Sequence, residues 1–278
     1  MLVTAPAHDK IFAGNRSIGR IALSVAADGH GSRRKRVHEQ GALRVRFPNA
    51  AAPGALDAVI VNTAGGMTGG DHFAIDVAVE ANARLVVTTA AAEKIYRSLG
   101  PDTRIDIKLA VGPGARLAWL PQEAILFDQV RLRRSVDVAL APGADLLLAE
   151  GIVFGRSAMG ETVRSGLLFD RWRVRIGGAL AFAESLCLDG AIAQDLARRA
   201  VAGGSVAVAS VLKVPGDEKA VAAVRAMEKD FAGEVGISAW NGIAVARLVA
   251  GDGAALHRDL IAVLTALSEP PLPRLWLN

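Results

Sequence analysis

The stretch "HFAIDVAVEANARLVVTTAA", residues 72–91, carries the pattern that decides the fold of this 278-residue chain. Its first half alternates, so that Phe73, Ile75, Val77 and Val79 share one face of an extended segment. Side chains of a strand point alternately to its two faces, and this alternation is typical of a strand with one face buried. The segments "TRIDIKLAV", "RRSVDVAL" and "RWRVRI" alternate in the same way, which predicts a mainly β protein.

The second half of the stretch belongs to a degenerate repeat. Five units share a small residue, an alanine and a leucine followed by an apolar run, and their leucines are Leu56, Leu85, Leu117, Leu146 and Leu180. A period of roughly thirty residues is typical of stacked supersecondary units. Pro53, Pro113 and Pro142 each precede a glycine, and a Pro-Gly pair favours a tight turn. We therefore expect layered β-hairpins or stacked strands in a helical, β-helix-like arrangement.

Helical spacing appears in three places. The segment "AAAEKIYRSLG", residues 90–100, predicts a short helix with an ion pair between Glu93 and Arg97. Two longer helices are expected near the C-terminus, over "PGDEKAVAAVRAMEKDF" and over "AALHRDLIAVLTALSEPP", which Pro270 and Pro271 end. Between them "ISAWNGIAVARLVA" predicts a turn and a strand. We expect a single domain over 1–278, with a β-rich body over about 1–212 and a helix-containing part over about 213–278.

Composition limits the class of protein. Hydrophobic residues make up 51% of the chain and charged residues 22%, which indicates a globular protein. The single cysteine, Cys187, excludes an internal disulfide framework and a cysteine-rich zinc site. The first residues resemble no signal peptide, and no apolar run approaches the roughly 20 residues that span a bilayer. We therefore expect a soluble, cytoplasmic protein.

Basic residues cluster in two stretches, although the net charge is only +4. The run "RRKR" occupies residues 33–36, and Arg171, Arg173 and Arg175 share one face of a predicted strand. Such stretches are either solvated strand faces or a docking surface for an acidic partner. Nucleic acid is disfavoured as a partner, because aromatic residues for base stacking are only 5% of the chain.

The glycine-rich segment "VNTAGGMTGGDHF", residues 61–73, invites comparison with a phosphate-binding loop. A P-loop needs a lysine after its last glycine, and here Asp71 stands in that place, where it would repel phosphate. A strand pattern follows, so no helix N-terminus faces the loop. We interpret the segment as a bend between strands, in which Gly69 and Gly70 allow close backbone approach and Asp71 is held at the bend.

Carboxylates stand at the ends of the repeat units, and they are Asp71, Glu93, Glu123, Glu150 and Glu161. In a stack of strands these positions either line one channel or serve singly as surface and ion-pair residues. The residues alone leave both interpretations open.

Four segments in this order resemble a known family: "NTAGGMTGGD", "TTAAAEKIYRS", "LPQEAILFD" and "GRSAMGE". Together they resemble the UreD family of urease accessory proteins, called UreH in some organisms. The final "PPLPRLWLN" is similar to the family's C-terminal ending, so the resemblance covers nearly the whole chain.

The resemblance implies a non-enzymatic chaperone built from stacked strands. It implies binding to the urease apoprotein and to UreF, and through UreF to the GTPase UreG, in an assembly that delivers nickel to the urease active site. It implies no tightly bound cofactor, only nickel in transit through an internal tunnel.

The resemblance assigns site residues position by position. Asp71, Glu150 and Glu161 are the carboxylates implied along a nickel path, since hard oxygen ligands hold nickel loosely enough to release it. Residues that match the motifs and are expected to shape the core or an interface are Thr63, Gly65, Gly66, Gly69, Gly70, Thr88, Thr89, Lys94, Tyr96, Arg97, Gln122, Glu123 and Arg156.

Two other functions compete with this one. A β-helical carbohydrate hydrolase or lyase would also use paired carboxylates, although the scarcity of aromatic residues disfavours a sugar-binding surface. A purely structural module would hold partners together without handling metal.

Overall fold

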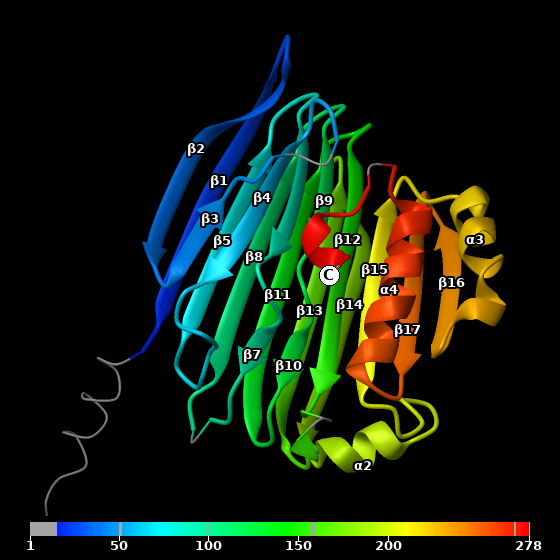
Figure 1. Cartoon of the computed structure of the whole chain (residues 1–278). Helices are drawn as coiled ribbons and strands as arrows, with labels where there is room; N and C mark the ends of the chain where they lie inside the picture. The colour runs from blue at the N-terminus through cyan, green and yellow to red at the C-terminus, as the bar shows by residue number, and fades with distance from the viewer. Residues whose placement is uncertain (1–15, 50–51, 99, 157–158, 270, 278) are drawn as a thin grey trace, which may run out of the picture.

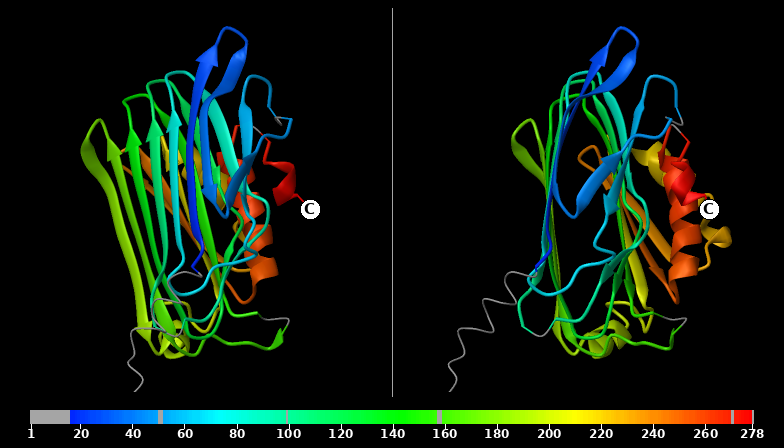
Figure 2. Two further views of the ribbon diagram at one scale, coloured as in Figure 1. Left: turned by 90° about the vertical axis from the view of Figure 1, so that its left-hand side faces the viewer. Right: turned by 60° about the vertical axis from the view of Figure 1, so that its left-hand side comes forward.

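A computed structural model describes residues 16–49, 52–98, 100–156, 159–269 and 271–277, and shows two β-sheets facing each other (Figures 1 and 2). The first residues, in which no signal peptide was expected, and Pro270 lie outside these ranges. The seven-stranded sheet has the order β14 (Ala179–Gly190), β13 (Gly166–Ile176), β11 (Val130–Leu140), β8 (Thr103–Val111), β5 (His72–Val79), β1 (Ile18–Asp28) and β2 (Gly31–Gly41).

The ten-stranded sheet forms the other layer. Its main order is β16 (Glu234–Trp240), β17 (Ile243–Ala250), β15 (Ala207–Val214), β12 (Asp145–Phe154), β9 (Arg116–Leu120), β6 (Arg84–Thr89), β4 (Leu56–Asn62) and β3 (Leu43–Arg46). Two short strands, β7 (Glu93–Ile95) and β10 (Ala124–Leu126), pair with each other, and β10 also pairs with the second half of β12.

The chain winds between the two sheets from β4 to β13. It crosses from β5 to β6, from β8 to β9 and from β11 to β12, and each new strand pairs in parallel with the one a coil earlier. Apolar side chains from both inner faces fill the space between the layers. The expected helical stack of strands is therefore confirmed.

The leucines of the repeat form a ladder across the ten-stranded sheet. Leu56 is paired with Leu85, Leu85 with Leu117, and Leu117 with Leu146. Leu180 does not join this ladder, so the fifth unit was wrongly assigned to the repeat. Its strand turns back on β13 as an antiparallel hairpin within the seven-stranded sheet, and its side chain is 53% exposed.

The helix predicted over residues 90–100 is wrong, because this segment contains the strand β7. Met67 donates its amide to the Lys94 carbonyl (2.8 Å), and Tyr96 donates its amide to the Met67 carbonyl (2.7 Å). Ile95 between them is fully buried in the core. Pairing with the glycine-rich bend and burial of Ile95 thus override a weak local preference for helix.

The C-terminal part places two helices on the outer face of the ten-stranded sheet (Figure 1). The helix α3 (Glu218–Arg225) begins at an aspartate cap, Asp217, and α4 (Gly253–Leu267) begins at Asp252. Both side chains accept a backbone amide of the first turn, the usual role of an N-cap residue. Both helices were predicted, whereas the single turn and strand expected between them form the hairpin β16–β17.

Smaller helical turns complete the chain. The helix α2 (Ile192–Ala197) was not predicted, and two 3-10 turns, η2 (Glu228–Asp230) and η3 (Arg274–Trp276), follow α3 and α4 respectively. Among the residues that the structure describes, no helix has the length and apolar character that a membrane crossing requires.

The two basic stretches lie on the seven-stranded sheet. The run at residues 33–36 is exposed on the edge strand β2. On β13, Trp172 and Val174 are buried as expected, while Arg171 pairs with Asp137 (3.1 Å) and Arg173 donates to the Glu184 carbonyl (2.8 Å). Arg171 and Arg173 therefore already have partners on neighbouring strands.

Candidate functional site

The glycine-rich bend between β4 and β5 packs directly on the segment around β7. A Cβ atom added to Gly69 would meet the Ser98 hydroxyl and would lie 2.5 Å from the carbonyl oxygen of Pro101. A Cβ atom added to Gly66 would lie 2.9 Å from the carbonyl oxygen of Lys94. Real Cβ contacts are longer than this, so the expected close backbone approach is confirmed at Gly69 and occurs also at Gly66. A Cβ atom added to Gly70 would instead meet the side chain of Arg16, so close backbone approach is not found there.

Asp71 holds the far end of the bend. Its carboxylate accepts the amide of Ser17 (2.7 Å) and the amide of Thr68 (2.8 Å), and the residue is 5% exposed. Gly65 and Gly70 adopt left-handed backbone conformations, with φ of 76° and 89°. Asp71 therefore fixes the conformation of the bend through one hydrogen bond at each oxygen.

An open pocket of about 1060 Å³ lies where the four motifs meet. It stands at the end of the stack that is lower in Figure 1, beyond β7 and β10. The motif residues that line it are Thr68, Gly69, Gly70, Tyr96, Arg97, Ser98, Phe127, Asp128, Arg156 and Glu161. The winding of the chain thus assembles segments that are about thirty residues apart into one candidate site.

Aromatic and charged side chains form the rim of this pocket. The guanidinium of Arg156 lies 4.3 Å from the ring centroid of Phe127 and donates from Nε to Glu161 (2.6 Å). Tyr96 packs edge-on against Phe127 at 4.8 Å and donates its hydroxyl hydrogen to the Gly65 carbonyl (3.2 Å). A cation over an aromatic face is electrostatically favourable, so Arg156 and Glu161 are held in place at the mouth.

Glu93 is a titratable group close to this end of the stack. Asn62 donates from Nδ2 to the Glu93 carboxylate (2.8 Å) and to the Gly66 carbonyl (3.3 Å). Burial raises the pKa of Glu93 to about 7, because the cost of desolvating the charged carboxylate outweighs the stabilisation by the Asn62 hydrogen bond. The expected pair with Arg97 is replaced by this contact with Asn62.

A buried ion cluster lies between the two sheets. Arg134 of β11 donates from Nε and Nη2 to Asp170 of β13 (3.1 and 2.6 Å) and from Nη1 to Glu150 of β12. Trp119 donates from Nε1 to the other oxygen of Glu150 (2.9 Å). All three charged residues are less than 9% exposed.

The protonation of this cluster follows from its burial. Desolvation raises the pKa of Glu150 above its ordinary value, against the attraction of Arg134. Burial alone would lower the pKa of Arg134, but the charges of Asp170 and Glu150 outweigh it and raise that pKa. Arg134 therefore stays charged, shared between two carboxylates.

Arg134 and Asp170 were not predicted as site residues, although the alternation of their strands carries a signal. In "VRLRRSVDVAL" Arg134 lies on the same strand face as the buried Leu132 and Val136. In "GLLFDRWRVRI" Asp170 lies on the same strand face as the buried Leu168 and Trp172. A charged residue on the inward face of an alternating strand needs a buried partner.

The threonines of the motifs have local roles. Thr63 donates its hydroxyl hydrogen to the Ala42 carbonyl (2.9 Å), and Thr89 donates to the Ala91 carbonyl (3.0 Å). Thr88 is 2% exposed, and its hydroxyl has no hydrogen-bond partner in the part of the chain that the structure describes.

Gln122 and Glu123 anchor the C-terminal segment rather than the pocket. Gln122 donates from Nε2 to the Leu275 carbonyl (3.1 Å). Glu123 Oε1 lies 2.6 Å from His257 Nδ1, and the His257 ring stacks on Trp276 at 5.2 Å. These two motif residues thus help to fix the end of the chain on the ten-stranded sheet.

The three carboxylates assigned to a nickel path lie in different environments. Asp71 is in the bend, Glu161 is at the pocket rim, and Glu150 is inside the stack. Within the described ranges, no three His, Cys, Asp or Glu side chains gather as they would around a bound metal ion.

Comparison with known proteins identifies the family. The family model described as "UreD urease accessory protein" matches residues 17–277. A urease accessory protein UreD from Rhodopseudomonas palustris (strain HaA2) is 56% identical over 275 residues, which cover 99% of this chain and 98% of the relative. One from Bradyrhizobium diazoefficiens is 52% identical over 268 residues, which cover 96% of each chain. The chain therefore belongs to the UreD family of urease accessory proteins, and its role lies in urease maturation.

Proposed function

We propose that the protein is a non-catalytic maturation scaffold that binds the urease apoprotein and UreF, reaches UreG through UreF, and assists nickel delivery to the urease active site. We expect this to take place in the cytoplasm. The observation that carries the proposal is the convergence of four separate motifs on one open pocket. Motif residues gathered at a surface are the arrangement expected of a partner-docking site.

Nickel passage is the more specific part of the proposal. Nickel is cargo here, so its contacts must be weak enough to release it, which suits single carboxylates and water better than a closed ligand set. Glu161 stands at the pocket rim beside Arg156, and Glu150 stands in the interior beside Arg134. We assign Glu161 to entry and Glu150 to the interior of the path.

Asp71 has a different role in this proposal. Its carboxylate accepts the backbone amide of Thr68 within the bend and the backbone amide of Ser17 beside it, so we assign it to holding the bend that forms one side of the pocket. Its replacement should impair the site through the shape of the bend rather than through loss of a nickel ligand.

Two measurements on the same variants test the scaffold and the path separately. Glu150→Gln and Glu161→Gln keep side-chain size, and Glu228→Gln, on an exposed turn, is the matched control. We expect both path variants to co-purify with UreF and urease apoprotein as the unchanged protein does, but to yield less active urease. If both variants assemble and load nickel normally, the proposed nickel path is refuted and the scaffold role stands. Normal urease activation in a strain deleted for this chain would refute both proposals.

A further inference from the structure

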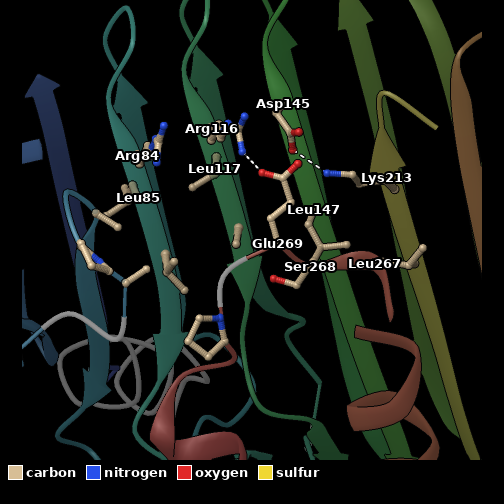
Figure 3. Close-up of a pocket in the computed structure, with 16 residues that line it drawn as sticks. Arg84, Leu85, Arg116, Leu117, Asp145, Leu147, Lys213, Leu267, Ser268 and Glu269 are labelled. Carbon is tan, nitrogen blue, oxygen red and sulfur yellow. Dashed lines mark hydrogen bonds and ion pairs between the residues drawn. The ribbon is translucent and has the colours of Figure 1, made fainter. Parts of the chain in front are cut away.

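A second pocket lies far from the motifs, on the outer face of the ten-stranded sheet (Figure 3). It has a volume of about 390 Å³. Its floor is an apolar row across three strands, in which Val86 is paired with Ala118 and Ala118 with Leu147. One wall is the end of α4, with Leu267, and the segment that follows it, with Pro271, so the pocket is a groove between the sheet and the C-terminal segment.

Charged side chains line this groove at the starts of β6, β9 and β12 and at the end of the antiparallel β15. Arg84, Arg116 and Asp145 are neighbours in register on β6, β9 and β12, and Lys213 on β15 pairs with Asp145 (2.7 Å). Figure 3 shows the three basic side chains around the groove. Strands are about 4.8 Å apart, so this row extends for about 14 Å, the length of roughly four extended residues.

The chain itself places a carboxylate among these cations. Arg116 donates from Nη1 to Glu269, which lies two residues after the end of α4. This hydrogen bond lowers the pKa of Glu269, and the positive charges of Arg116, Lys213 and Arg84 act in the same direction. The Glu269 side chain is nevertheless 69% exposed, and such surface ion pairs are weak and exchange easily with solvent.

The groove has cationic capacity beyond what Glu269 uses. Lys213 is engaged by Asp145, and Arg116 by Glu269. Across the described ranges, the Arg84 guanidinium has neither a hydrogen-bond acceptor nor an ion-pair partner. Two adjacent arginines therefore face one exposed carboxylate, and a second acidic group would be favoured between them.

We propose that this groove is a docking site for an extended acidic segment of a partner protein, with one carboxylate bridging Arg84 and Arg116 and an apolar neighbour on the floor. Glu269 is the occupant in the free chain and is displaced on binding. The chain itself shows the class of occupant, since it places the acidic Glu269 and the apolar Pro271 in the groove. The length of the charged row favours a peptide over a small anion.

The inference goes beyond the scaffold function and does not depend on it. The groove lies at the starts of β6, β9 and β12, whereas the motif pocket follows the opposite ends of the same coils. Binding to the groove can be measured on the purified chain alone, so its failure would leave the urease role intact.

The test uses a labelled, end-capped Ala-Glu-Ala-Leu peptide and its Ala-Gln-Ala-Leu counterpart, with binding followed by fluorescence anisotropy at low salt. We expect Glu269→Gln to bind the acidic peptide about two- to fivefold more tightly, because an exposed competing ion pair is removed. Arg84→Ala and Arg116→Ala should each weaken binding by about fivefold or more, and the exposed Arg199→Ala should change nothing.

Three outcomes would overturn the proposal. The first is equal affinity for the acidic and the amide peptide, or no binding to Glu269→Gln at millimolar peptide. The second is unchanged affinity in Arg116→Ala with native thermal melting. The third is binding of free glutarate as tightly as the acidic peptide, which would make the groove a small-anion site instead.

Discussion

Replacing Arg134 by methionine tests whether the buried ion cluster is a matched network. The change keeps an unbranched apolar stem but removes the guanidinium, and it leaves Glu150 and Asp170 facing each other between the sheets. Removing one partner of a buried pair costs about 3–5 kcal/mol, because an uncompensated charge remains in an apolar site. For a chain of this size each kcal/mol corresponds to roughly 2–4 °C, so we expect the melting temperature to fall by roughly 6–20 °C.

A neutral version of the cluster supplies the control. Arg134→Met combined with Glu150→Gln and Asp170→Asn leaves no buried charge, and it should recover most of the lost stability. Urea unfolding and calorimetry at pH 7.5 would measure both variants. A loss below about 1 kcal/mol in the single variant, or no recovery in the triple variant, would refute the reasoning.

The single variant should also respond to pH in a defined direction. Burial already raises the pKa of Glu150, and without Arg134 the attraction that opposes this rise is lost, so the folded-state pKa of Glu150 lies further above its unfolded value. The folded state then binds more protons than the unfolded state, so stability must rise as the pH falls from 8 towards 6. The unchanged protein, with Arg134 in place, should show a shallower slope.

The remaining predictions concern three residues near the motif pocket. Glu93→Gln should stabilise the protein at pH 8 by up to roughly 3 kcal/mol, because a carboxyl with a folded-state pKa of about 7 loses stability as the pH rises from about 4.5 through 7; denaturation at pH 5 and 8 would show no such gain at pH 5. Thr88→Val should add about 1 kcal/mol in urea unfolding by removing a buried, unpaired hydroxyl, and a loss would contradict this. Gly69→Ala should cost about 2 kcal/mol or more in thermal melting, since its Cβ would lie 2.5 Å from the Pro101 carbonyl oxygen. Gly29→Ala, whose Cβ meets no atom within 4 Å, is the neutral control. Equal melting temperatures for the two variants would show that the bend adjusts freely and would contradict this prediction.

Much of the architecture could be predicted because each coil repeats the same local pattern. Alternation placed Phe73 and Val77 on a buried face, and the repeat anticipated the ladder of Leu56, Leu85 and Leu117. The prediction for Leu180 was wrong because an Ala-Leu pair after a turn can precede either of two paths. The chain can cross to the other sheet, as in the earlier units, or form an antiparallel hairpin within the same sheet, as it does here.

The site was harder to predict, because its contacts join distant parts of the chain. The local sequence around Ile95 favours a helix, and pairing with Met67 and with the strand β10 makes it a strand. The alternation of the strands indicates that Arg134 and Asp170 point inward. It does not indicate that Arg134 bridges Asp170 and Glu150, because that contact depends on the order of the strands in both sheets. The order of the motifs indicated the family, but it did not predict that the motifs meet at one pocket, which results from the winding of the chain.

The antiparallel hairpins at the flanks of the coil have a consequence for self-association. At one flank β13 turns back as β14, and at the other β2 turns back on β1; each hairpin has an irregularity in its register. An open parallel coil offers each end as a template for the next copy, which is the geometry of a growing fibre. In the seven-stranded sheet the edge strands β14 and β2 run antiparallel to their neighbours, and β2 is highly basic. Such edges do not continue the parallel register. The chain thus ends its own stack on both sides, which leaves its faces and loop ends, rather than its edges, for contact with other molecules.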